Sequence, residues 1–286
     1  MAAEPRPVRI AQISDIHCGS ALFEEDLLRS TLDRVKAMAP DCVVVAGDLT
    51  ADGYPWEYEE AAKWLEELES PLLVIIGNHD ARNLGYLHFE RIYGNRFPTL
   101  KFDFDQERAE EIGVQGLTIV GVDSSEPDKN GGRIGREWYP EIERHFSDSD
   151  HFKVFVLHHH LVSIPGTGRE RSTVEDAGDV LDLLARLEVD VVLSGHKHVP
   201  FFWGLNGMLV CNSGTASTRR VRGRTPPSFN EITLYSNHID VHTHYPDGRR
   251  ELSAHRAGLV NAEFREALVL TQDFRDTNRV DEAATR

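Results

Sequence analysis

Short apolar runs and longer amphipathic segments alternate along the N-terminal part of the chain. The runs Val8–Ser14, Cys42–Ala46 and Leu72–Ile76 are rich in valine, isoleucine and leucine. Runs that are apolar on both faces are typical of strands buried in an α/β layer. The segments between them, Glu24–Met38 and Pro55–Glu69, carry apolar residues at helical spacing, and Pro55 suits a first helical turn. The order strand, helix, strand, helix, strand predicts a parallel sheet.

The alternation continues further along the chain and then changes. We expect strands at Leu117–Val122, Phe152–Leu157 and Val189–Leu193, a helix over Arg136–His145, and another helix after a capping box at Ser172–Glu175. Later apolar runs have no helices between them, which favours antiparallel strands at Phe201–Trp203, Met208–Cys211, Glu231–Tyr235 and Ile239–His244. The tail is more polar. We therefore expect one domain over residues 1–245 and a C-terminal extension over 246–286 that either docks on the core or is partly disordered.

Polar side chains with metal-binding chemistry follow five of the predicted buried strands. They are Asp15 and His17, Asp48, the run Asn78-His79-Asp80, the triplet His158-His159-His160, and the pair His196 and His198. In open α/β sheets the carboxyl ends of the strands form the ligand-binding edge. A single motif of this kind arises easily by chance, but five in one chain are hard to explain without a shared site.

Composition narrows the class of protein. The chain has 286 residues, of which 40% are hydrophobic, enough for one sizeable domain, although the length also allows two smaller ones. It has no apolar run of about 20 residues and no signal-peptide pattern, so we expect a cytoplasmic protein without a membrane partner. The three cysteines, Cys18, Cys42 and Cys211, have no paired spacing, which argues against disulfides and thiolate zinc sites.

The formal net charge is −16, which disfavours binding to long nucleic acids. A small phosphorylated substrate is still compatible with this charge, because a metal centre can supply local positive charge.

The order of the strand-end motifs resembles that of the calcineurin-like metallophosphoesterase superfamily. The chain looks most like its class III cyclic-nucleotide phosphodiesterase and glycerophosphodiesterase branch, because Val122-Asp-Ser-Ser125, Gly131-Gly-Arg-Ile-Gly135 and Trp138 are similar to a segment of those enzymes. The resemblance covers about residues 8 to 240. It implies a four-layer α/β/β/α sandwich with two mixed β-sheets, and a metallophosphoesterase catalytic domain over residues 1–245.

The resemblance also implies two metal sites. One would use Asp15, His17, Asp48 and His198, and the other Asp48, Asn78, His158 and His196, with Asp48 shared. Imidazoles and carboxylates suit two divalent or mixed-valence ions of Mn, Fe or Zn. Two such ions roughly 3.5–4 Å apart can share a carboxylate and a hydroxide and hold both ends of an in-line displacement.

The resemblance assigns further roles around these ligands. His79 would face the phosphate together with Asn78 and protonate the leaving oxygen. Asp80 could accept a hydrogen bond from His79, or be a simple turn residue. His159 would approach the phosphate or support the ligands. His160 stands where related chains often have proline.

Three weaker patterns have both a functional and a structural interpretation. Arg219, Arg220, Arg222 and Arg224, with Arg169 and Arg171, could clamp an anion, but solvated loops on an acidic surface are the favoured interpretation. His238, Asp240, His242 and His244 alternate along a strand and could form a third metal site, but a polar strand face is favoured. Cys18 could sense redox state, but a buried inert thiol is favoured.

The resulting hypothesis is hydrolysis of a small phosphodiester, such as a cyclic nucleotide or glycerophosphodiester, by a metal-bridging hydroxide. The alternatives are a phosphomonoesterase acting on a small metabolite, a nuclease, and a non-catalytic metal-binding scaffold. Ile76 stands where protein phosphatases of the superfamily usually have arginine, which disfavours that activity. A homodimer is left open.

Overall fold

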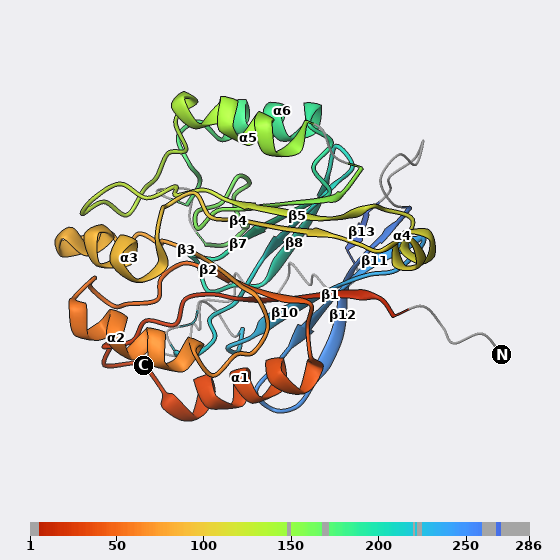
Figure 1. Cartoon of the computed structure of the whole chain (residues 1–286). Coiled ribbons are helices and arrows are strands. Elements are labelled where there is room, and N and C mark those ends of the chain that lie inside the picture. The colour runs from red at the N-terminus through yellow and green to blue at the C-terminus, as the bar shows by residue number, and fades with distance from the viewer. Residues whose placement is uncertain are drawn as a thin grey trace, which may run out of the picture.

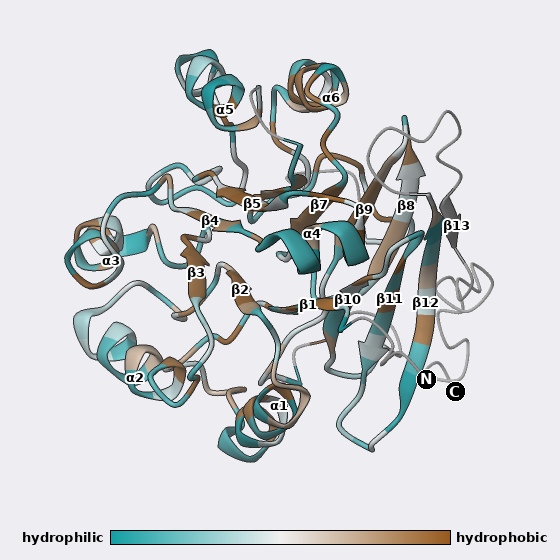
Figure 2. Ribbon diagram, turned by 45° about the vertical axis from the view of Figure 1, so that its right-hand side comes forward, coloured by the Kyte–Doolittle hydropathy of each residue, from teal (hydrophilic) through white to brown (hydrophobic). Residues whose placement is uncertain are grey.

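The computed structural model is a sandwich of four layers (Figures 1 and 2). Two β-sheets pack face to face, with α1 and α2 outside one sheet and α5 and α6 outside the other. The structure describes residues 6–147, 150–167, 172–219, 221, 225–258 and 267–269. The α/β/β/α architecture with two mixed sheets is confirmed.

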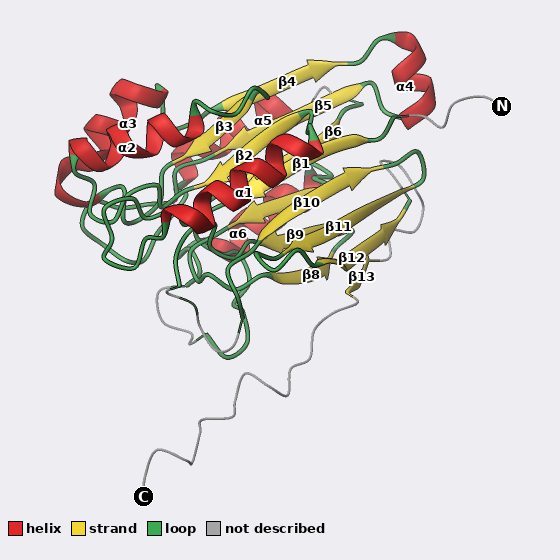
Figure 3. Cartoon of the chain, turned by 90° about the horizontal axis from the view of Figure 1, so that it is seen from below, coloured by secondary structure: helices red, strands yellow, loops and turns green. Residues whose placement is uncertain are grey.

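The first sheet joins parallel strands from the N-terminal part of the chain to antiparallel strands from its C-terminal part. Within the described residues its order is β13-β12-β11-β10-β1-β2-β3. Its strands are β1 (Val8–Ile13), β2 (Cys42–Ala46), β3 (Leu72–Ile75), β10 (Phe229–Leu234), β11 (His238–His244), β12 (Arg250–Ala257) and β13 (Ala267–Val269). β1, β2 and β3 are parallel to one another, whereas β10 is antiparallel to β1. Figure 3 shows these strands side by side.

The second sheet has the order β4-β5-β6-β7-β9-β8 in the described part of the chain. Its strands are β4 (Thr99–Asp103), β5 (Gly116–Gly121), β6 (Phe152–Val156), β7 (Val191–Ser194), β8 (Phe201–Leu205) and β9 (Met208–Asn212). The four central strands β5, β6, β7 and β9 are parallel. The edge strands β4 and β8 are antiparallel to their neighbours.

The helices follow from local sequence signals. They are α1 (Glu25–Met38), α2 (Pro55–Leu65), α3 (Gly85–Tyr93), α4 (Gln106–Ile112), α5 (Tyr139–Phe146) and α6 (Ala177–Arg186). α1 has acidic residues in its first turn and Lys36 in its last, which suits the helix dipole. α2 begins with Pro55, and the Glu57 carboxylate accepts a hydrogen bond from the Tyr54 backbone N–H at 3.1 Å.

The space between the sheets is largely apolar, and a polar network crosses it beneath the strand ends. Gln12 is fully buried in β1, and its amide donates to the Ser194 carbonyl at the end of β7 at 2.9 Å. Asn230 of β10 donates to Gln12 Oε1 at 3.0 Å. Because an unpaired buried amide is costly, this network favours one alignment of the two sheets. That alignment brings the ends of β1 and β7 together.

Two expectations about elements are wrong. β9 is not confined to antiparallel pairing, because it lies parallel to β7 while the tight turn at Asn206 and Gly207 carries β8 to the edge. Residues 172–175 do not cap a helix. They run as a bridge in which Val174 N–H donates to the His160 carbonyl at 3.0 Å, and α6 begins only at Ala177.

Residues 250–257 form β12 in the first sheet, so part of the expected extension packs as a strand. The boundary at residue 245 stays a prediction. Among the described residues, no helix is long and apolar enough to cross a membrane.

Candidate metal centre

The loops that follow β1, β2, β3, β6 and β7 meet at one edge of the sandwich. The first two loops are paired by backbone hydrogen bonds: Asp15 N–H donates to the Gly47 carbonyl at 3.0 Å and His17 N–H to the Asp48 carbonyl at 2.9 Å. From the second sheet, Gly195 N–H donates to the His158 carbonyl at 3.1 Å. The structure thus brings all seven candidate ligands to one place.

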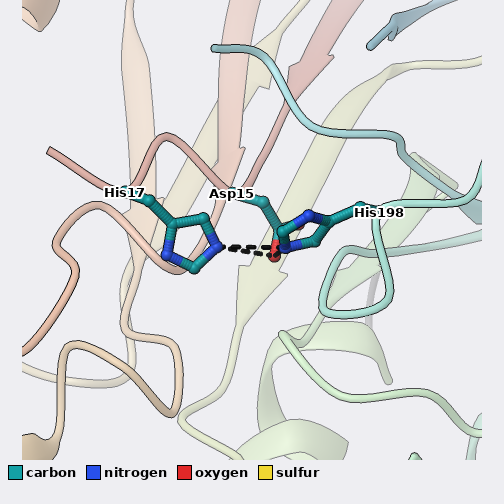
Figure 4. A group of neighbouring side chains, drawn as sticks. All are labelled: Asp15, His17 and His198. Carbon is teal, nitrogen blue, oxygen red and sulfur yellow. Dashed lines mark hydrogen bonds and ion pairs between the residues drawn. The ribbon is translucent and has the colours of Figure 1, made fainter. Parts of the chain in front are cut away.

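Asp15, His17 and His198 form one group of donor atoms. His17 Nε2 and His198 Nε2 lie 3.0 Å apart, and His198 Nε2 lies 3.2 Å from Asp15 Oδ1. Figure 4 shows both rings turned toward the Asp15 carboxylate, which is fully buried. Ser14 supports this carboxylate, because its hydroxyl donates to Asp15 Oδ2 at 2.6 Å.

Asn78, His158 and His196 form a second group. His158 Nε2 lies 3.2 Å from Asn78 Oδ1, and His196 Nδ1 lies 2.9 Å from the same oxygen. His158 Nδ1 is 2.7 Å from the Ala46 carbonyl, so this nitrogen carries the proton and donates it. In the neutral ring Nε2 then carries the lone pair, and it faces the site.

Asp48 lies between the two groups. Its Oδ2 is 3.7 Å from His17 Nε2 and 3.3 Å from His158 Nε2, while Oδ1 accepts the His79 backbone N–H at 2.9 Å. With metal–ligand bonds near 2.0–2.2 Å, donor atoms on one ion lie about 2.9–3.4 Å apart. Most of the measured separations fall in or close to this range. Imidazole nitrogens and carboxylate oxygens that converge at these distances fit divalent cations.

The electrostatics of the site agree with this fit. Burial alone would lower the pKa of His158, but the Asp48 carboxylate beside it raises the pKa to about 9. Burial lowers the pKa of His17 to about 3, so this imidazole is neutral, as a metal ligand must be. The two buried carboxylates thus favour positive charge at the centre, which either a protonated His158 or a bound cation can supply.

The backbone of the ligand loops is unusual. Asp15, His17, Asp48, His196 and His198 all have positive φ angles, between 53° and 79°. Such conformations cost about 1–3 kcal/mol each in non-glycine residues and gather at functional sites.

The motif glycines have a steric reason. Gly47 has φ +84°, and a Cβ there would lie 2.6 Å from His158 Nδ1. A Cβ on Gly195 would lie 2.6 Å from Asp15 Oδ2. Side chains at either position would displace the candidate ligands.

His79 lies at the rim of the site. Its Nδ1 is 2.6 Å from the Ala51 carbonyl, and its Nε2 is 3.2 Å from Arg82 Nη2. The expected hydrogen bond from His79 to Asp80 is not formed. The fully buried Asp80 carboxylate instead accepts from the backbone N–H groups of Leu49, Thr50 and Gly77 and from the Thr50 hydroxyl.

The other members of the histidine triplet support the ligands. His159 is fully buried, and its Nδ1 lies 2.9 Å from Ser124 Oγ. The centroid of its ring lies 4.6 Å from that of the His196 ring. His160 Nε2 is 2.7 Å from the Gly195 carbonyl, to which it donates. Burial lowers the pKa of His160 to about 4, which keeps it neutral. A contact of His159 with substrate stays a prediction.

The arginine cluster offers less support for a functional role. Arg219 has a side chain that is 73% exposed, and its Nε pairs with Glu24 at 2.6 Å. Arg169, Arg171, Arg220, Arg222 and Arg224 lie outside the described residues. Cys18 is fully buried, and burial raises the pKa of its thiol, which argues against the redox interpretation.

Sequence reasoning missed Arg82 and Asn130. Arg82 Nη1 donates to Asp52 Oδ1 at 2.9 Å, and Nη2 donates to Asn130 Oδ1 at 3.1 Å. Asn78 Nδ2 lies 3.5 Å from the same Asn130 oxygen. Together they line the rim beside His79. A cation only two residues beyond Gly-Asn-His-Asp was the available signal for Arg82.

Comparisons with known proteins agree with this geometry. A model of the calcineurin-like phosphoesterase family matches residues 8–200. A probable cyclic nucleotide phosphodiesterase of Synechococcus sp. is 29% identical over 214 residues, or 71% of this chain and 78% of that protein. One of the same description from Xenorhabdus bovienii is 23% identical over 228 residues, covering 76% of this chain and 89% of that protein.

Among solved structures, a purple acid phosphatase from yellow lupin seeds superposes with a TM-score of 0.62 at 16% identity. The match covers 87% of this chain and 53% of that chain, and it bears on the fold alone.

Proposed function

Because this chain belongs to the calcineurin-like phosphoesterase family, and is thus a metal-dependent phosphoester hydrolase, we propose that it hydrolyses a small phosphodiester at a centre of two metal ions. The observation that carries the proposal is the position of Asp48. Its Oδ2 faces His17 Nε2 of one donor group and His158 Nε2 of the other. A carboxylate in that place is suited to bridge two cations.

The metal-holding residues would divide as the geometry divides them. Asp15, His17, Asp48 and His198 would hold one ion, and Asp48, Asn78, His158 and His196 the other. His158 is favoured within its triplet, because its Nε2 faces Asp48 whereas His160 Nε2 donates to a backbone carbonyl. Mn, Fe and Zn all suit these donors. Bound ions would supply Lewis acidity and local positive charge for attack of water on phosphorus.

The rim residues would handle the substrate. The Nδ1–H of His79 is committed to the Ala51 carbonyl. Nε2 would therefore protonate the leaving oxygen once Arg82 turns from it to the phosphate and Nε2 takes up a proton. Arg82 is the cation that would bind a phosphate oxygen beside it, since its guanidinium already reaches His79 Nε2. Asn78 would also contact that phosphate, because its Nδ2 lies at the same rim beside Asn130. Asp80 would act indirectly by fixing the loops.

The diester preference rests on the relatives, two of which are described as probable cyclic nucleotide phosphodiesterases. A cyclic nucleotide or a glycerophosphodiester carries one negative charge on the reacting phosphate. A phosphomonoester carries nearly two. A phosphomonoesterase is the second candidate, because the same metal-binding residues serve it equally well.

The first experiment compares bis(p-nitrophenyl) phosphate with p-nitrophenyl phosphate in the presence of Mn²⁺. We expect turnover of both and a higher kcat/KM for the diester. A clear preference for the monoester would reverse the assignment. Absence of turnover with Mn²⁺, Fe²⁺ and Zn²⁺ would favour a metal-binding scaffold.

The second experiment separates chemistry from metal binding. His79→Ala should keep its metal content, measured by plasma mass spectrometry, and lose kcat by at least about a hundredfold, as expected for a general acid. Arg82→Ala should raise KM and weaken inhibition by inorganic phosphate. Arg219→Ala is the matched control, because that arginine pairs with Glu24 at the surface. Equal effects of the two arginine variants would remove Arg82 from the mechanism.

A further inference from the structure

The outer face of β11 carries a second cluster of metal-binding side chains. Along this strand Ile239, Val241 and Thr243 are buried toward the other sheet, whereas the alternating polar residues are half-buried on the opposite face. The pairing register places His255 of β12 directly across from Asp240. His255 has no sequence neighbour that would suggest a ligand role, and the fold brings it there.

The two oxygens of the Asp240 carboxylate face different imidazoles. His255 Nδ1 lies 2.7 Å from Oδ1, and His238 Nε2 lies 3.6 Å from Oδ2. One donor atom from each of the three residues lies within 4.8 Å of the others. Donor atoms on a shared ion would be about 2.9–3.4 Å apart, so the two measured distances bracket the required value.

The orientation of His238 is fixed by its surroundings. Its ring stacks on that of Tyr235 with the centroids 4.4 Å apart and the planes at 13°. Its Nδ1 lies 2.6 Å from Asn237 Oδ1 and donates to it. Metal-binding histidines are commonly held in this way, with one ring nitrogen donating to an oxygen and the other free to bind. Nε2 of His238 therefore directs its lone pair toward a carboxylate.

A cross-strand ion pair explains only part of this arrangement. It accounts for His255 and Asp240, which lie at hydrogen-bond distance. It leaves His238 Nε2 facing Asp240 Oδ2 at 3.6 Å, beyond a normal hydrogen bond. A cation between these atoms would satisfy the lone pair of His238 and both carboxylate oxygens.

The remaining polar residues of the face are engaged elsewhere. His242 Nδ1 lies 3.1 Å from Arg250 Nη2, and His244 Nε2 lies 2.8 Å from Glu231 Oε2. The register shift between Val241 and His242 separates this half of the strand from the other. The face thus divides into an ion-paired half and a half with a ligand-like arrangement.

We propose that His238, Asp240 and His255 form a third metal site, one that takes Zn²⁺ or a similar transition-metal ion. Two imidazoles and a carboxylate are a common zinc ligand set, with water completing the shell. The side chains are 28%, 17% and 32% exposed, so an ion can enter from solvent. Binding would link β11 to β12 and stabilise the C-terminal edge of the sheet.

The site lies far from the strand ends that carry the candidate centre. Pairing aligns Leu234 with both Val8 and Ile239, so His238 is level with the start of β1, whereas Asp15 follows its end. At 3.3 Å per residue the two sites are about 20 Å apart along the strands. Each can therefore be removed without touching the other.

The test counts zinc by equilibrium dialysis and plasma mass spectrometry in the full chain. His255→Gln and His238→Gln should each bind about one equivalent less than wild type or bind that equivalent at least tenfold more weakly. His242→Gln is the matched control on the same face and should lose none. The comparison among these variants holds whatever the catalytic edge binds. Equal zinc content in all four proteins would overturn the proposal, as would an equal loss in the control.

A second measurement avoids substitution. Zn²⁺ should protect His238 and His255, but not His242, from diethyl pyrocarbonate, with the sites read by peptide mass spectrometry. Unchanged labelling of His238 and His255 at saturating Zn²⁺ would overturn the proposal even if the variants failed to fold.

Discussion

Replacing Asp80 by asparagine distinguishes a structural role from a catalytic one. The carboxylate is fully buried, and Oδ2 accepts from Leu49 N–H at 3.1 Å and Gly77 N–H at 2.9 Å. Oδ1 accepts from Thr50 N–H at 2.8 Å and from the Thr50 hydroxyl at 2.7 Å. These donors belong to the loops that carry Asp48 and Asn78, so Asp80 fastens the two loops together.

The cost of Asp80→Asn can be worked from these contacts. If the oxygen of the new amide still accepts from the N–H groups of Leu49 and Gly77, its NH₂ group faces the Thr50 N–H. The Thr50 hydroxyl can turn and accept a hydrogen bond from this NH₂ group. One orphaned backbone donor costs about 1–3 kcal/mol, and two retained bonds each lose roughly 1 kcal/mol of charge assistance. Burial and Asp48 raise the pKa of Asp80 to about 7, so removing the charge returns part of this. The net loss is about 2–4 kcal/mol of unfolding free energy.

Thermal unfolding and steady-state kinetics test this reasoning together. A loss of this size should lower the Tm by about 3–7 °C. Mn²⁺ affinity should fall as the loops loosen, while kcat at saturating Mn²⁺ stays close to wild type because His79 keeps its bond to Ala51. Asp33→Asn, an exposed residue of α1, is the control and should change neither. An unchanged Tm with a greatly reduced kcat would refute the structural role and restore Asp80 to the chemistry.

Three further outcomes are expected. Arg256→Met should lower the free energy of unfolding in urea by about 3–5 kcal/mol, because it leaves the buried Asp190 carboxylate without its 2.9 Å ion pair. A cost below about 1 kcal/mol would mean that this ion pair contributes little to stability. Burial alone would raise the pKa of Glu231, but His244 and Arg250 lower it to about 2. Its stabilisation is therefore complete above its ordinary value of 4.5 and is lost as pH falls toward 2, and Glu231→Gln should flatten that acid limb of the unfolding curve. Dialysis against a chelator should abolish hydrolysis and lower the Tm, and Mn²⁺ should restore both, whereas activity that survives the dialysis would contradict the metal requirement.

The strand ends were predictable because burial leaves a clear mark on sequence. Cys42–Ala46 is apolar throughout and is β2 at the same bounds, and Asp48 follows it. Val8–Ser14 and Leu72–Ile76 each differ from the observed strand by one residue at the end. Parallel strands direct their carboxyl ends to one edge, so the topology predicts proximity among the motifs after β1, β2 and β3 and between those after β6 and β7. The meeting of these two groups depends on how the two sheets align.

Side-chain partners were not predictable in the same way. Asp80 follows His79 in sequence, which suggested a bond between them, but the tight turn directs its carboxylate back to the previous loop. His255 joins Asp240 only through the register of β11 and β12, and register depends on turn geometry and packing across the sheet. The position of β9 beside β7 likewise depends on which edge of the second sheet is available for pairing.

The left-handed backbone at the candidate ligands explains why so many contacts around the site stabilise the ligand loops. Five such residues at about 1–3 kcal/mol each would together cost as much as the net stability of many domains. Asp15, His17 and Asp48 can stay in this conformation because the loops after β1 and β2 continue to pair beyond the strands. Asp80 fastens the loop after β2 to the loop after β3, and the Gln12 network aligns β1 with β7. The strain is thus offset by contacts that lie one layer beneath the ligands, which is why substitutions in that layer should weaken metal binding without altering any ligand.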